Sequence, residues 1–235
     1  MKRSILIAVG LILVISLTAF AAEYQSGSFI GFVPNDHGDV VLEVNIAKGN
    51  IASVNVISPV KTAATYDYEE GIDAYLEYPA KAVEQQSADI EVVSGATSSY
   101  NQYNEAVQMA LDIASGNYDG NKFYGLTRNF GHGHTLLEVT VEEGNVTAVD
   151  YVTSDFDDSK SAMLMPAKTD SYPHEVALNY YKDFPELAKE TANDGDGDFE
   201  VDIVSGATHS GHDYNAAFRN ALNQAVTAGQ ADFDL

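Results

Sequence analysis

The sequence Ser-Gly-Ala-Thr occurs twice in the chain, each time where a short apolar stretch gives way to a helical pattern. The residues are Ser94, Gly95, Ala96 and Thr97 in the first occurrence and Ser205, Gly206, Ala207 and Thr208 in the second. We expect short strands at 90–92 and 201–203 to lead into the two motifs, and a helix to follow each. The first turn of a helix has backbone N–H groups without partners and carries the positive end of the helix dipole. Such a junction favours the binding of a phosphate group.

Each residue type in the motif suits that chemistry. Glycine allows a backbone geometry and a close approach that a Cβ would block, and alanine keeps the next side chain small. The threonine hydroxyl lies at the start of the helix, where a phosphoryl group bonded to it would meet the free N–H donors. An alternative is that Ser94, Thr97 or Ser98 only caps the helix, as Ser and Thr often do. The recurrence of the motif at the same junction favours a functional role.

The chain contains an internal repeat. Residues 43–54 align with residues 138–149, and the two motifs and the helical patterns after them follow in the same order. Self-similarity of this kind indicates two copies of one structural unit. We place the two homologous units at 23–117 and 118–235.

Both units have the same pattern of secondary structure. Apolar residues alternate through 42–56 and are interrupted at 48–50, which predicts a hairpin with one buried face, and 137–151 repeats the pattern. We expect helices at 80–86 in the first unit, at 175–192 in the second, and after each motif. The predicted fold class is α+β, with two homologous units that are each a small antiparallel sheet packed with helices, preceded by an apolar N-terminal helix.

Residues 1–22 are typical of a targeting segment. Lys2 and Arg3 precede an uncharged, apolar run from Ile5 to Ala22, as in a secretory signal peptide. As a helix this run would reach about 27 Å, close to the ~30 Å hydrocarbon core of a bilayer, so an uncleaved membrane anchor is an alternative. Both interpretations place the rest of the chain outside the cytoplasm, either secreted or anchored to the cell membrane.

Composition excludes several classes of function. The 235 residues carry a formal net charge of −23, which argues against nucleic acid as a partner because phosphates need a cationic surface. The chain has no Cys, which removes disulfides, thiolate metal sites and Cys nucleophiles. The histidines at 131–134 and 209–212 match no metal-ligand template, and the acidic loop at 194–198 lacks the Gly and Glu of a calcium loop. We therefore expect no metal site.

The motif and its setting resemble the FMN-binding domain family. This domain occurs in the C subunit of the sodium-pumping NADH:quinone oxidoreductase, in the G subunit of the Rnf complex and in extracytoplasmic bacterial flavoproteins. The resemblance implies that Thr97 and Thr208 each carry FMN through a phosphoester bond, installed by a flavin transferase that uses FAD. The family has an acidic residue, usually Asp, six places before that threonine. Asp202 fits this pattern, whereas the first unit has Glu91.

Two covalent flavins on an exported chain imply an electron carrier rather than an enzyme with its own substrate pocket. The resemblance implies three kinds of partner: the flavin transferase, a membrane electron donor that is quinol- or NADH-linked, and an extracellular or periplasmic acceptor. Tyr100, Tyr103 and Tyr214 lie near the motifs, where they could stack on a flavin ring, although helical spacing favours core packing for the last two. The alternative is a cofactor-free secreted or surface binding protein built on the same repeat.

Overall fold

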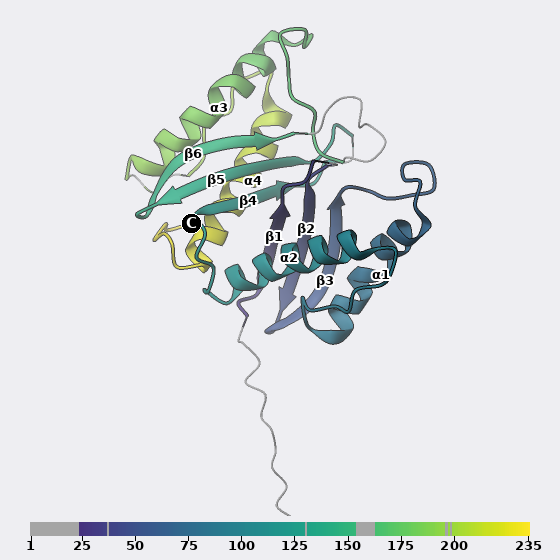
Figure 1. The fold of residues 1–235 in the computed structure, drawn as a ribbon. Coiled ribbons are helices and arrows are strands. Elements are labelled where there is room, and N and C mark those ends of the chain that lie inside the picture. Colours follow the sequence, from purple (N-terminus) through teal and green to yellow (C-terminus); the bar gives the residue numbers. More distant parts are fainter. Residues whose placement is uncertain (1–23, 37, 130, 154–162, 196, 198) are drawn as a thin grey trace, which may run out of the picture.

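The computed structural model describes residues 24–36, 38–129, 131–153, 163–195, 197 and 199–235. The expected N-terminal helix therefore lies outside the described residues. The first unit contains the strands β1 (Gly27–Val33), β2 (Val40–Ala47) and β3 (Asn50–Ser58) and the helices α1 (Glu69–Gln85) and α2 (Thr97–Ala114). The second contains β4 (Lys122–Thr127), β5 (Thr135–Glu142) and β6 (Asn145–Val152) and the helices α3 (Glu175–Asn193) and α4 (Thr208–Thr227). Figure 1 shows the same element order in both units.

The strands of each unit form an antiparallel sheet, in the orders β1-β2-β3 and β4-β5-β6. The α+β class and the two hairpins expected from the sequence are confirmed. Each hairpin closes through two residues with positive φ, Lys48 (53°) and Gly49 (75°) in the first and Glu143 (50°) and Gly144 (81°) in the second. A two-residue turn of this geometry matches the right-handed twist of the strands that it joins.

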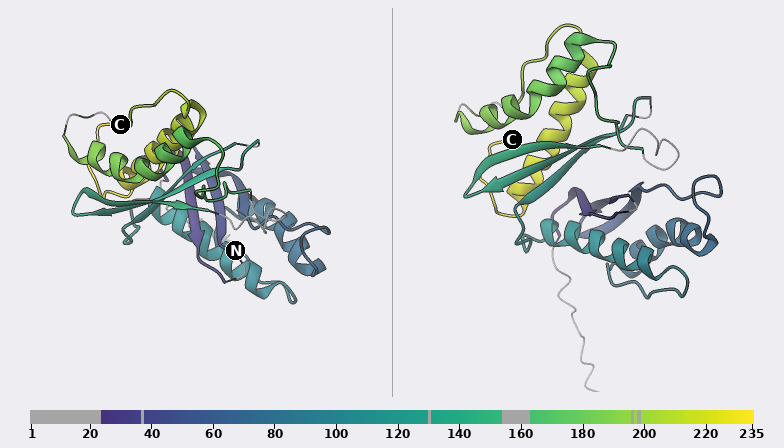
Figure 2. Two further views of the ribbon diagram at one scale, coloured as in Figure 1. Left: turned by 90° about the horizontal axis from the view of Figure 1, so that it is seen from above. Right: turned by 45° about the horizontal axis from the view of Figure 1, so that its top comes forward.

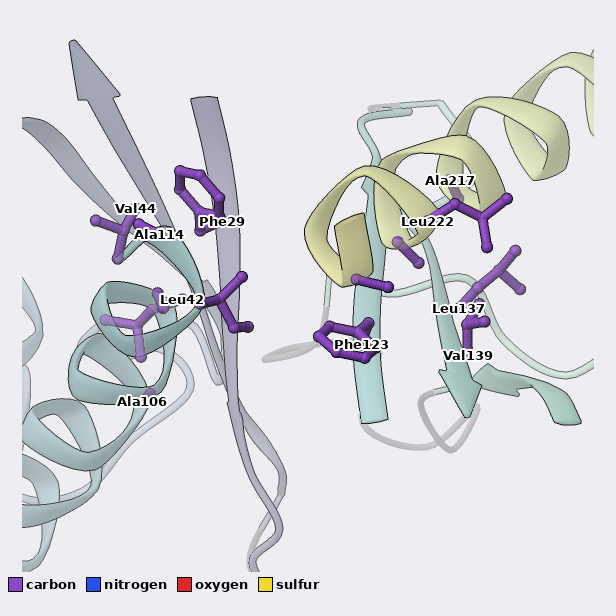
Figure 3. Packing of buried hydrophobic residues seen from close by; sticks show 14 of the residues in the cluster. Phe29, Leu42, Val44, Ala106, Ala114, Phe123, Leu137, Val139, Ala217 and Leu222 are labelled. Atoms are coloured by element: carbon purple, nitrogen blue, oxygen red, sulfur yellow. The ribbon is translucent and has the colours of Figure 1, made fainter. Parts of the chain in front are cut away.

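Helices cover one face of each sheet, and the opposite faces of the two sheets meet in the middle of the molecule (Figure 2). Gly31 in β1 lets α2 approach the strand, because a Cβ at this position would lie 1.8 Å from the carbonyl oxygen of Ala106. Gly125 in β4 has the same relationship to Ala217 of α4, also at 1.8 Å. Figure 3 shows buried side chains from β1, β2 and α2 of the first unit and from β4, β5 and α4 of the second.

The segments before the motifs are not strands, so the expected strands at 90–92 and 201–203 were wrong. A side chain from the following helix makes the backbone hydrogen bonds that a partner strand would make. The side-chain amide of Asn104 accepts from the Ile90 N–H (3.3 Å) and donates to the Ile90 carbonyl (3.0 Å). Asn215 does the same for Val201, at 2.9 and 2.8 Å. Ile90 and Val201 are buried as they would be in a strand, whereas Val92 is exposed, and the backbone is held to the helix.

The first helix is longer than expected. The prediction of a helix at 80–86 was wrong in its start, because α1 begins at Glu69 and continues through Pro79. In the second unit α3 also contains a proline, Pro185, and agrees with the predicted 175–192 within one residue. Neither proline ends its helix. None of the helices in the described ranges combines the length and the apolar character that crossing a membrane requires.

Candidate functional site

Each motif forms a tight turn directly before a helix. The Ala96 N–H donates to the Val93 carbonyl at 3.0 Å, and the Ala207 N–H donates to the Val204 carbonyl at the same distance. The glycine inside each turn has a positive φ, 91° at Gly95 and 96° at Gly206. Side chains other than glycine rarely adopt this conformation, so the glycine is required by the backbone geometry at this corner.

The helices that follow the motifs begin without a side-chain cap. Their N-cap residues are Ala96 and Ala207, and neither helix receives a capping hydrogen bond from a side chain. The alternative that Ser94, Thr97 or Ser98 caps the helix was therefore wrong. The first backbone bonds within the helices are Tyr100 N–H to Ala96 O and Gly211 N–H to Ala207 O. The N–H groups of the first turn before them point out of the helix and are free to bind a ligand.

The two motif threonines are exposed, whereas the alanines beside them are buried. Ala96 and Ala207 are each 3% exposed, which anchors the turn to the core and explains the need for a small side chain. Thr97 and Thr208 are exposed, as are the serines and glycines of both motifs. The acidic residues six places earlier, Glu91 and Asp202, are exposed as well. Each threonine hydroxyl is thus accessible to a second protein or to a bulky group.

The start of the preceding helix lies against the motif glycine, and here the two units differ. A Cβ on Gly95 would lie 2.8 Å from the Cγ of Glu70, at the start of α1. A Cβ on Gly206 would lie 3.3 Å from Cγ1 of Val176, at the start of α3. The first motif therefore has a carboxylate beside it, and the second has an exposed apolar side chain.

A groove of 580 Å³ adjoins the second motif, between α3 and residues 200–204. Its apolar walls include Val176, Leu187 and Val204, which are 48%, 39% and 43% exposed. Tyr180 forms its inner wall and is 4% exposed. Burial raises the pKa of Tyr180 to about 12, with a further contribution from the charge of Asp202. The groove thus combines apolar surface and the neutral hydroxyl of Tyr180 with the carboxylates of Asp183, Asp194, Glu200 and Asp202.

Two lysines that sequence analysis did not single out lie beside the helices that begin at the motifs. Lys61 and Lys168 each belong to a Pro-x-Lys-Thr sequence, at 59–62 and 166–169. This repeated sequence could have identified the two lysines as candidate functional residues. Lys61 is 5% exposed, and its Nζ donates to Ser99 Oγ at 2.7 Å. Lys168 Nζ donates to the Tyr214 hydroxyl at 2.5 Å. Burial lowers the pKa of Lys61, and it lowers the pKa of Lys168 to about 8.

The tyrosines near the motifs pack in the core. Tyr103 and Tyr214, for which core packing was favoured, are 0% and 1% exposed, and Tyr100 is 1% exposed. Tyr103 packs edge-on against Tyr78, with ring centroids 5.2 Å apart. Tyr214 stacks on Tyr180 with ring planes 10° apart and centroids at 6.1 Å. None of the three tyrosines that were considered for ring stacking is open to a flavin ring from outside, and Tyr180 connects Tyr214 to the groove.

The histidines and acidic loops do not converge. His209 and His212 are exposed on α4, whereas His134 is buried and accepts a hydrogen bond from the Asn129 N–H through Nδ1. Among the residues that the structure describes, no three histidine or acidic side chains are grouped so that they could hold a metal ion. The acidic loop at 194–198 lies partly outside the described residues.

The sequence of the chain matches the family model of the FMN-binding domain over residues 37–112 and 131–223, which together make up more than half of the chain. The chain belongs to the FMN-binding domain family. Both matched segments contain a Ser-Gly-Ala-Thr corner, in agreement with tandem copies of the domain. No curated protein matches the chain. A solved structure of a Clostridium perfringens protein matches with 22% identity and a TM-score of 0.32, over 39% of this chain and 88% of that one.

The residues at both FMN-binding domain corners fit a flavin mononucleotide. The uncapped first turn provides N–H donors for a phosphate, and the exposed threonine hydroxyl lies at the same end of the helix. In the second unit the groove beside Val204 provides apolar surface for a ring. The lysine beside each helix adds positive charge to a chain that is otherwise strongly acidic.

Proposed function

We propose that the chain is an extracytoplasmic electron-transfer flavoprotein that carries FMN on Thr97 and Thr208 through phosphoester bonds. The observation that carries the proposal is the pair of exposed threonines, each at the uncapped start of a helix and after a glycine turn. A serine or threonine at the N-cap position normally caps a helix, but in both units that position is occupied by alanine. Here the hydroxyl and the free N–H groups lie at the same end of the helix, where a phosphate attached to the threonine could be held.

Attachment would transfer the FMN moiety of FAD to the threonine. A bond forms between the threonine Oγ and the phosphorus of the FMN half, the pyrophosphate bond breaks, AMP leaves, and the hydroxyl proton is released to solvent or to a base on the transferase. The exposure of both corners supports this step, because the transferase must reach Oγ with its own bound FAD. Glu91 and Asp202, six residues before the threonines and exposed, are available for contact with the transferase.

The flavin would supply the redox chemistry, and this chain would hold it and adjust its potential. Attachment through the phosphate leaves the ring free to exchange electrons, and a covalent bond prevents loss of the cofactor outside the cell. We propose a membrane donor, quinol- or NADH-linked, and an acceptor outside the cytoplasm. The apolar segment at 1–22 supports an exported or membrane-anchored location.

The intact mass of chain coexpressed with a flavin transferase tests the proposal. We expect two additions, each of FMN less one water, and one addition in Thr97→Val and in Thr208→Val. Ser98→Ala serves as the control because it removes an exposed hydroxyl next to Thr97 but outside the motif, and it should keep both additions. A folded chain without any addition would overturn the proposal in favour of a cofactor-free surface protein on the same repeat.

A further inference from the structure

The first unit buries the ammonium group of Lys61, and the second partly buries that of Lys168. Among the residues that the structure describes, neither has a carboxylate partner within ion-pair distance, although the charge of Asp213 acts on Lys168 from farther away. Lys61 comes from the loop after β3, and its Nζ contacts Ser99 Oγ at 2.7 Å in the first turn of α2. Its other close neighbours are aromatic rings, with Nζ 4.7 Å from the Tyr66 centroid and 5.5 Å from the Tyr103 centroid. Ser99 lies two residues after Thr97, so the charge lies directly behind the start of the helix.

The second unit repeats the arrangement with a different hydrogen bond. Lys168 Nζ contacts the Tyr214 hydroxyl, and it lies 5.3 Å from the Tyr172 centroid and 5.1 Å from the Tyr181 centroid. Tyr66 and Tyr172 occupy matching places in the loops before α1 and α3. Tyr214 also matches Tyr103 in the alignment of the two helices. The same lysine and tyrosine positions therefore surround both sites.

Burial makes these lysines costly to keep. Removing an ammonium ion from water without a counter-ion destabilises a fold. Methionine in the same place would fill the space without that cost. The two units nevertheless both have lysine here, although the neighbouring corner differs between Glu70 and Val176. A repeated residue that lowers stability calls for a role outside folding.

We propose that Lys61 and Lys168 raise the reduction potential of the flavin carried by their own unit. The inference rests on the proposed function. Reduction adds electrons, so a fixed positive charge nearby favours the reduced form of the cofactor. At an effective dielectric constant of about 20, two unit charges about 10 Å apart change an equilibrium by more than tenfold. Direct contact between the ammonium group and the ring is therefore not required.

In the second unit the path from the charge to the groove is short. Lys168 contacts the Tyr214 hydroxyl, Tyr214 stacks on Tyr180, and Tyr180 forms the inner wall of the groove beside Val204. A ring held in this groove would be separated from the ammonium group by the packed rings of Tyr214 and Tyr180. Carboxylates also line the groove and act on the ring with the opposite sign, so the lysine variant isolates the contribution of the ammonium group. Low dielectric and the absence of screening salt make the charge effective over this distance.

The test uses chains that carry one flavin each. Thr208→Val leaves the flavin on Thr97, and Thr97→Val leaves the flavin on Thr208. In both backgrounds Lys61→Met and Lys168→Met are made, and the midpoint potential is measured by spectroelectrochemical titration with dithionite as reductant. We expect the lysine variant in the unit that carries the flavin to favour the oxidised form at least tenfold, which is about 30 mV for a two-electron couple. The same substitution in the other unit is the matched control and should shift the potential much less.

Lysine-to-arginine variants should keep the potential, because the charge remains. Without cofactor, Lys61→Met should raise the melting temperature, since it removes a buried charge. Equal shifts from both lysines, or none, would overturn the inference while the flavin remained attached. Loss of flavin attachment in the Met and Arg variants would also overturn it, because the lysine would then serve attachment. Absence of flavin from the chain with both lysines and both threonines would instead refute the proposed function.

Discussion

The side chain of Gln224 in α4 accepts a hydrogen bond from the backbone N–H of Ile30 in β1, at 3.0 Å. The same amide donates to the carbonyl of Tyr124 in β4. β1 and β4 are the edge strands of their sheets, and an unpaired edge exposes backbone groups to unwanted pairing. One helix side chain therefore joins the edges of both sheets, and the two units share a buried polar contact.

Replacement of Gln224 by leucine should destabilise the whole chain by about 1–3 kcal/mol. Gln224 is 1% exposed, and its loss leaves a buried N–H and a buried C=O without partners. Urea unfolding measures the change, and Asn223→Ala, at the exposed neighbouring position, should change the free energy of unfolding little. Equal stability of Gln224→Leu and wild type would show that water or another group satisfies the edge strands.

Replacement of Gly31 or Gly125 by alanine should cost about 1–3 kcal/mol or more, because the new Cβ would lie 1.8 Å from a helix carbonyl oxygen. The helix would have to move away from the strand, and the start of the same helix carries the motif. Gly49→Ala is the control: its φ is 75° with no atom within 4 Å, so only backbone strain of about 1 kcal/mol is expected. Similar losses at all three positions, measured by chemical denaturation, would contradict the close approach.

Replacement of Glu70 by valine should increase the rate of flavin attachment at Thr97. The carboxylate lies beside Gly95, where it repels a phosphate, whereas the second unit has Val176 at this place. An exposed charge of this kind is worth about 0.2–1 kcal/mol, so a rise of up to about fivefold is expected in a time course of intact mass. Glu69→Val controls for net charge, and Val176→Glu should slow attachment at Thr208. An unchanged rate in both designed variants would contradict the electrostatic difference between the units.

The stability of the flavin-free chain should rise with pH between about 8 and 9.5, in part through Lys168. Burial lowers the pKa of Lys168 to about 8, although the charge of Asp213 opposes this shift. An unfolded lysine has a pKa of about 10.4, so in this range the unfolded chain binds more protons and stability increases with pH. The neighbouring Tyr214 stays neutral because burial raises its pKa.

The comparison of wild type with Lys168→Met isolates this contribution. Urea unfolding at pH 7.5 and 9.5 should show that the free energy of unfolding rises less with pH in Lys168→Met than in wild type. Lys182→Met, which removes an exposed lysine paired with Asp170, should behave as wild type. Identical gains in all three chains would mean that Lys168 keeps an ordinary pKa in the folded protein.

The sequence was informative wherever the signal was periodic or repeated. Alternating apolar residues predicted the hairpins, and the duplicated motif predicted two matching corners. The strands expected before the motifs were wrong because burial of Ile90 and Val201 resembles that of a strand, while Asn104 and Asn215 supply the hydrogen bonds. An asparagine in a helix gives no sequence pattern from which a pair of side-chain hydrogen bonds to a neighbouring backbone segment can be predicted.

Contacts between segments that are far apart in the chain could not be predicted from the sequence. Gln224 corresponds to Ile113 in the first helix, so the bridge between the two edge strands breaks the repeat and has no counterpart to reveal it. The two lysines belong to a repeated Pro-x-Lys-Thr sequence, but this sequence does not indicate whether the lysine is buried or exposed. Only the structure shows that Lys61 is 5% exposed and lies behind the first turn of α2.

Peptide mapping by tandem mass spectrometry tests the central claim most directly. Chain coexpressed with a flavin transferase is digested, and the peptides that contain Thr97 and Thr208 are sequenced. The account predicts FMN, bound through its phosphate, on the hydroxyl of each of these threonines and on no other residue. Flavin located on other side chains, or both peptides unmodified in a folded chain from a host that modifies a known flavoprotein, would contradict it.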